Sequence, residues 1–69
     1  MPYVNIRVTD EGVTPAAKAA LIAGVTELLQ RVLGKDPDTT HVVIDEVPLD
    51  NWGVGGVPAQ EYRRRHNAP

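Results

Sequence analysis

The chain has 69 residues, which is enough for one small domain, residues 1–69. It has no cysteine and two histidines, so neither a disulfide framework nor a zinc knuckle can stabilise so small a core. The net charge of −2 argues against nucleic-acid partners, and the apolar stretches are too short to span a membrane. Because the start of the chain also lacks a signal-peptide pattern, we expect a cytoplasmic protein that is stabilised by self-association.

The first half of the chain predicts a strand followed by a long helix. Residues 3–9 alternate between apolar and polar side chains, which is typical of a strand with one apolar face. Residues 14–33 predict a helix, with Thr14 as the N-cap, Pro15 at the first helical position and Gly34 as the left-handed C-cap. An apolar stripe runs along this helix through Leu21, Ile22, Val25, Leu28, Leu29 and Val32.

A second strand is predicted over residues 41–46, where an unbroken Val-Val-Ile run is typical of a strand covered on both faces. A strand, a long helix and a strand form a β-α-β unit, in which the two strands are parallel and the crossover is right-handed. A single helix covers one face of such a small sheet. We therefore expect another copy of the chain to cover the other face, as a homo-oligomer.

The remaining segments complete the predicted fold. Residues 48–51 indicate a loop, and the glycine-rich residues 52–57 indicate a hairpin or a bulge. Residues 63–69 form a basic tail that is free to fray. The predicted fold class is α/β in the α+β sense, a single β-α-β unit with parallel strands and a C-terminal hairpin.

Pro2 is the strongest candidate for a catalytic residue. If Met1 is removed, Pro2 carries a free secondary amine, whose pKa lies nearer neutrality than that of a lysine and falls further when the amine is desolvated. A neutral amine can act as a general base on a carbon acid or as a nucleophile toward a carbonyl. The alternative is that the Met-Pro start is accidental, because so short a motif has little specificity.

The order of motifs resembles the 4-oxalocrotonate tautomerase family over nearly the whole chain. The matching features are Met1-Pro2, the first strand, Glu11-Gly12, the long helix, Ile44-Asp45-Glu46 at the end of the second strand, and Trp52-Gly53-Val54-Gly55-Gly56. The resemblance implies a cofactor-independent and metal-independent isomerase that assembles as a homohexamer or another multiple. It also implies that Pro2 moves a proton as base and then as acid, beside an aromatic wall formed by Trp52. The alternative for Trp52 is an ordinary packing aromatic.

The chain departs from the family at its two substrate-binding arginines. Val13 and His41 stand at those positions, and neither reproduces a bidentate guanidinium. His41 can still donate a hydrogen bond to a substrate carbonyl, or it can be a structural strand histidine. Other cations that could replace the arginines are Arg7 and the tail residues Arg63, Arg64 and Arg65, whose alternative role is a solvated charge run.

These observations predict a tautomerase that acts on a small enol, dienol or keto acid, with Pro2 as the catalytic residue and His41 and Trp52 as substrate-binding residues. Two alternatives remain open within the same fold. One is a proline-dependent hydratase-like or dehalogenase-like enzyme, which needs a carboxylate to activate water. The other is an oligomeric scaffold or binding protein without catalytic activity.

Overall fold

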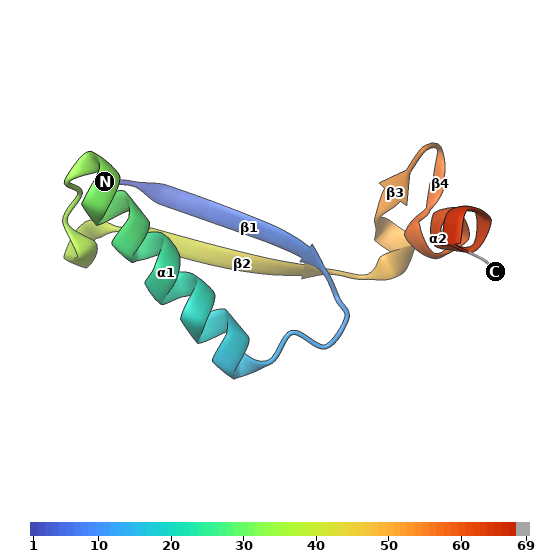
Figure 1. Ribbon diagram of the computed structural model, residues 1–69, viewed down its shortest axis with the longest axis horizontal. Helices are drawn as coiled ribbons and strands as arrows, with labels where there is room; N and C mark the ends of the chain where they lie inside the picture. Colours follow the sequence, from blue (N-terminus) through green and yellow to red (C-terminus); the bar gives the residue numbers. More distant parts are fainter. Residues whose placement is uncertain (68–69) are drawn as a thin grey trace.

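Two parallel strands, β1 (Tyr3–Thr9) and β2 (His41–Val47), form the centre of the molecule (Figure 1). The computed structural model describes residues 1–67. The strands align in register along their full length, with Tyr3 opposite His41 and Thr9 opposite Val47. The predicted β-α-β unit with parallel strands is confirmed, and the second strand extends one residue beyond its predicted end.

Helix α1 (Pro15–Leu33) connects the two strands and has the predicted caps at both ends. The Thr14 hydroxyl oxygen accepts a hydrogen bond of 3.1 Å from the backbone N–H of Ala17. Gly34 adopts φ 67°, a left-handed conformation that glycine reaches without steric cost, and its N–H donates to the carbonyl of Gln30 at 2.9 Å. The limits of the helix are therefore determined by local sequence.

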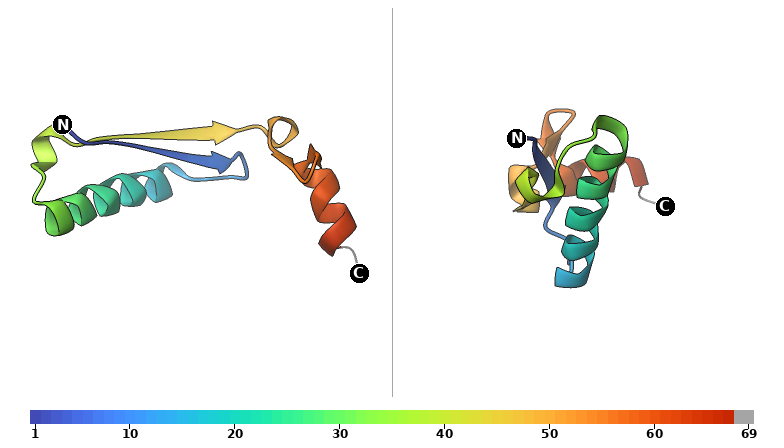
Figure 2. Two further views of the ribbon diagram at one scale, coloured as in Figure 1. Left: turned by 90° about the horizontal axis from the view of Figure 1, so that it is seen from above. Right: turned by 90° about the vertical axis from the view of Figure 1, so that its left-hand side faces the viewer.

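Helix α1 lies along one face of the sheet and leaves the other uncovered, as Figure 2 shows. Lys18 of the helix forms an ion pair with Glu46 of β2, so the side chains that share the face of Glu46 point toward α1. Tyr3 and Val43 lie on the opposite face and remain 64% and 43% exposed. This opposite face, occupied by the odd-numbered residues of the two strands, is called the open face below.

The chain after β2 forms a second group of elements, which we call the C-terminal unit (residues 48–67). It contains a 3-10 turn (Leu49–Asn51), a short antiparallel hairpin of β3 (Gly53–Val54) and β4 (Val57–Pro58), and helix α2 (Ala59–Asn67). Gly55 and Gly56 form the hairpin turn with φ 61° and 88°, the left-handed pair that a two-residue turn of type I′ requires. The predicted hairpin is confirmed.

Helix α2 was not predicted, and residues 63–67 are helical where the sequence indicated a tail free to fray. Two kinds of local contact stabilise this short helix. Glu61 forms ion pairs with Arg64 and Arg65, which follow it by three and four residues. The ring of His66 stacks on that of Tyr62 with centroids 4.0 Å apart. Residues 68 and 69 of the predicted tail lie outside the described part.

The molecule is too extended to bury a core of its own. It measures 46 × 24 × 20 Å and has a radius of gyration of 15.8 Å, whereas a compact chain of this length has about 11 Å. Within residues 1–66, Ala59 is the one buried residue, at 4% exposure. The accessible surface is 5069 Å², against about 4,200 Å² for a compact monomer of this mass. The excess of roughly 800 Å² equals the area that one partner buries in a standard protein interface.

Candidate functional site

Pro2 and His41 are neighbours at the end of the sheet where both strands begin. The carbonyl oxygen of Pro2 accepts a hydrogen bond of 3.0 Å from the backbone N–H of His41. This contact continues the ladder that pairs Tyr3 with His41, so the parallel register itself brings the two residues together. Pro2 is half-buried and the His41 side chain is exposed, while Met1 is 87% exposed.

Trp52 lies at the opposite end of the sheet within the same chain. It follows the 3-10 turn after β2, and its backbone N–H donates to the carbonyl of Leu49 at 3.2 Å. Its own carbonyl accepts a hydrogen bond of 2.7 Å from Ala59, which attaches the start of α2 to the hairpin. Because the seven residues of β2 span about 20 Å, a single chain does not bring Trp52 to Pro2.

Val13 also lies away from Pro2, in the loop between β1 and α1 at the end where β1 finishes. The cations proposed as replacements for the missing arginines are all engaged by carboxylates of the same chain. Arg63 binds Glu11, and one of its hydrogen bonds, from Nη2 to Oε2, measures 3.1 Å. Arg64 and Arg65 bind Glu61 within α2.

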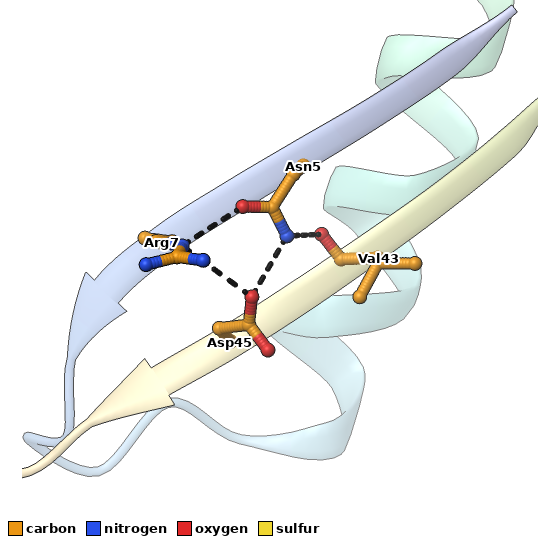
Figure 3. A network of polar contacts seen from close by, with 4 residues as sticks. All are labelled: Asn5, Arg7, Val43 and Asp45. Carbon is orange, nitrogen blue, oxygen red and sulfur yellow. Dashed lines mark hydrogen bonds and ion pairs between the residues drawn. The ribbon is translucent and has the colours of Figure 1, made fainter.

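Arg7, the fourth candidate cation, belongs to a polar network on the open face (Figure 3). Its Nε donates to Oδ1 of Asn5 at 3.1 Å and lies 3.6 Å from Oδ2 of Asp45. The amide nitrogen of Asn5 donates to the same Asp45 oxygen at 2.8 Å and to the carbonyl of Val43 at 3.3 Å. This network was missed in the sequence, although the parallel register, which places Arg7 opposite Asp45, contains its signal.

Two carboxylates are held in their charged form by these contacts. Hydrogen bonds from Arg63, and then from Thr9, lower the pKa of Glu11 to about 2. The hydrogen bond from Lys18 lowers the pKa of Glu46. The adjacent residue Asp45 faces the network on the other side of the strand, so the two neighbouring carboxylates do not form an acid-base pair, as expected from strand geometry.

Residues 1–67 contain no group of three His, Asp or Glu side chains that could hold a metal ion. In the same part of the chain, no helix combines the length and the apolar character needed to cross a membrane.

Comparison with known proteins identifies the family of the chain. The sequence model of the family described as tautomerase enzyme matches residues 2–62, from Pro2 to the first turn of α2. The chain belongs to the tautomerase family. Membership in this family supports an isomerase of the tautomerase type.

Two curated relatives show how far the family likeness extends. The chain is 58% identical over 65 residues to a probable tautomerase K2 of Dickeya dadantii, with 94% of this chain and 97% of the relative covered. It is 41% identical over 64 residues to a 2-hydroxymuconate tautomerase of Pseudomonas putida, with 93% and 100% covered.

Two solved structures share the fold of this tautomerase-family chain. DmpI from Helicobacter pylori superposes with a TM-score of 0.85 at 38% identity, covering 91% of this chain and 97% of that chain. A heterohexamer 4-oxalocrotonate tautomerase from Chloroflexus aurantiacus superposes with a TM-score of 0.81 at 27% identity, covering 91% and 100%. The predicted family and fold class are thus confirmed.

Proposed function

We propose that this chain is a tautomerase that moves a proton α to a carbonyl group in a small enol, dienol or keto acid, with the Pro2 amine as the catalytic group. The observation that carries the proposal is the hydrogen bond between the Pro2 carbonyl and His41. It fixes the first residue after Met1 to the start of the sheet, which gives the amine a rigid support. The match to a 2-hydroxymuconate tautomerase supports the same class of reaction.

The mechanism requires removal of Met1, because the nitrogen of Pro2 is otherwise a tertiary amide without basicity. The 87% exposure of Met1 is compatible with that removal. The neutral amine then takes a proton from the substrate, and the ammonium group so formed returns a proton to a carbon conjugated with the new carbonyl group. His41, beside Pro2, donates a hydrogen bond to the oxygen of the substrate.

The proposed site is completed by a second copy of the chain. Trp52 and Pro2 lie at opposite ends of one sheet, so the aromatic wall next to Pro2 comes from the C-terminal unit of a neighbour. The surface excess of this chain and its open face support self-association, and the Chloroflexus aurantiacus relative is itself a heterohexamer. We propose that this chain forms a homohexamer.

The test compares protein whose Met1 has been removed with protein that retains it, each verified by intact mass. Ketonisation of 2-hydroxymuconate and of phenylenolpyruvate is followed by ultraviolet absorbance, and size-exclusion chromatography with light scattering serves as the control for equal assembly. We expect the processed protein to turn over at least about 100-fold faster, because the blocked nitrogen cannot accept a proton. Equal rates in the two forms would refute the mechanism, and absence of turnover in both would favour a scaffold.

A further inference from the structure

Apart from the covalent connection, few polar contacts attach the C-terminal unit to the β-α-β unit (residues 1–47). Of the hydrogen bonds and ion pairs in the described residues, those between Glu11 and Arg63 are the ones that cross from one unit to the other. The backbone contacts on either side stay within their own unit, such as Asp10 with Val47 and Asn51 with Pro48. Within residues 1–67, the Glu11–Arg63 pair is therefore the polar contact that joins the two units.

The pair has a geometry suited to orienting one unit against the other. Both nitrogens at the end of the Arg63 guanidinium contact the Glu11 carboxylate, one on each oxygen. A two-point contact of this kind restricts rotation, which a single ammonium group would allow. The carboxylate is itself held in place, because the Thr9 hydroxyl donates to its Oε2 at 2.7 Å. Arg63 is thus fixed to the end of β1 through a side chain that is already oriented.

The position of Arg63 is coupled to that of Trp52 inside the C-terminal unit. Arg63 lies on α2, whose first residue, Ala59, is buried and donates its N–H to the Trp52 carbonyl at 2.7 Å. The ring of Tyr62, the neighbour of Arg63, packs against the hairpin turn, where a Cβ atom added to Gly55 would lie 3.5 Å away. Displacement of α2 therefore displaces the hairpin and Trp52 with it.

We propose that the Glu11–Arg63 ion pair is a latch that sets the position of the C-terminal unit, and of Trp52 in particular, relative to the sheet. Glu11 and Arg63 are then positioning residues. Their effect on catalysis rests on the proposed function of Trp52 as a wall of the site, whereas their effect on the surroundings of Trp52 does not. The lowered pKa of Glu11, about 2, agrees with a latch that stays charged throughout the physiological range.

The size of the expected effect follows from the exposure of the two side chains. The side chain of Arg63 is 48% exposed and that of Glu11 is 37% exposed, which limits the strength of their ion pair to that of good surface pairs. A bidentate contact at the upper end of that range corresponds to an equilibrium shift of about two- to fivefold. We therefore expect a shift in the position of the unit and not its complete release.

The test uses the assembled protein and the variants Arg63→Gln and Glu11→Gln. Trp52 is the single tryptophan of the chain, so fluorescence excited at wavelengths that the two tyrosines do not absorb, and the indole N–H signal in NMR, report on its surroundings alone. The matched control is Arg64→Gln, which removes a cation from the same helix but leaves the contact between units intact. A double variant with the charges exchanged, Glu11→Arg with Arg63→Glu, tests rescue.

We expect both single variants to move the Trp52 emission to longer wavelength and to raise KM about two- to fivefold with kcat little changed, while Arg64→Gln keeps the wild-type Trp52 emission. The exchanged pair should recover most of the emission and of KM. An Arg63→Gln variant that matches Arg64→Gln in Trp52 emission and in the indole signal would overturn the latch. If Arg63→Gln shifts the emission but the wild-type protein turns over no enol substrate, the latch stands and the proposed function fails.

Discussion

The β-α-β unit and the C-terminal unit are stabilised in different ways. In the first, seven consecutive residue pairs join β1 to β2, and α1 is capped by its own sequence at both ends. In the second, a two-residue turn forms the short hairpin, two local ion pairs and one aromatic stack stabilise the short helix α2, and the hydrogen bond from Ala59 to Trp52 joins the two. The comparison teaches that repeated backbone pairing places Pro2 and His41, whereas individual contacts place Trp52.

The largest expected effect tests the residue that the β-α-β unit positions. Replacing Pro2 with alanine in the processed protein leaves an amine at the same place but removes the ring that restricts it. We expect the turnover number to fall by roughly 100-fold, the lower end of what a general acid-base group contributes. Steady-state kinetics with an enol substrate measure the fall. Unchanged turnover would mean that the activity does not depend on Pro2.

The second effect concerns the open face. Val43 is 43% exposed there, and an aspartate at this position would place an unpaired charge against a second copy. We expect Val43→Asp to weaken assembly by at least about 2 kcal/mol, or roughly 30-fold in the dissociation constant. The control is Ala20→Asp on the exposed side of α1. Sedimentation velocity over a dilution series measures both, and equal assembly in the two variants would contradict a partner on the open face.

The third effect tests the C-terminal unit through its aromatic residue. If Trp52 of a neighbouring copy excludes water from Pro2, Trp52→Ala should raise the pKa of the Pro2 amine and lower kcat/KM about tenfold near pH 7. Trp52→Phe keeps an aromatic wall and should stay close to wild type. The pH dependence of kcat/KM checks this expectation. A Trp52→Ala variant with an unaltered profile would mean that the C-terminal unit does not reach the site.

The smallest expected effect is the response of the Glu11–Arg63 ion pair to low pH. The pKa of Glu11 falls from 4.5 to about 2 because of Arg63, so this pair stabilises the folded state above pH 4.5. That contribution is lost as the pH falls from 4.5 toward 2, where Glu11 becomes protonated in the folded state as well. Trp52 emission should therefore begin to change below pH 4.5 in wild type, while the Glu11→Gln variant should lack this component. Identical acid titrations of the two proteins would show that the pair does not hold the C-terminal unit.

The elements of the β-α-β unit could be predicted because each has a signal within a few residues. The alternation over Tyr3–Thr9 defines one strand, and the cap residues Thr14 and Gly34 define the ends of the helix. The hairpin was equally accessible, since a Gly-Gly pair is a strong signal for a tight turn. The parallel orientation of the two strands then followed from the length of the connection.

Helix α2 and its latch could not be predicted in the same way. The helix has no apolar stripe, and its three consecutive arginines are equally typical of a solvated tail. Glu11 and Arg63 are 52 residues apart, and nothing local in either segment indicates the other. For the candidate site, the neighbourhood of Pro2 and His41 follows from strand order. The roles of Pro2, His41 and Trp52 stay predictions.

The most direct test of the account is an NMR titration of the Pro2 amine, labelled with nitrogen-15, in the processed and assembled protein. We predict a pKa at least about one unit below that of the same amine in a short peptide with the sequence of residues 2–6, because an apolar environment disfavours the ammonium form. Titration of the protein and the peptide at the same pH would contradict the central claim that Pro2 acts as a neutral base.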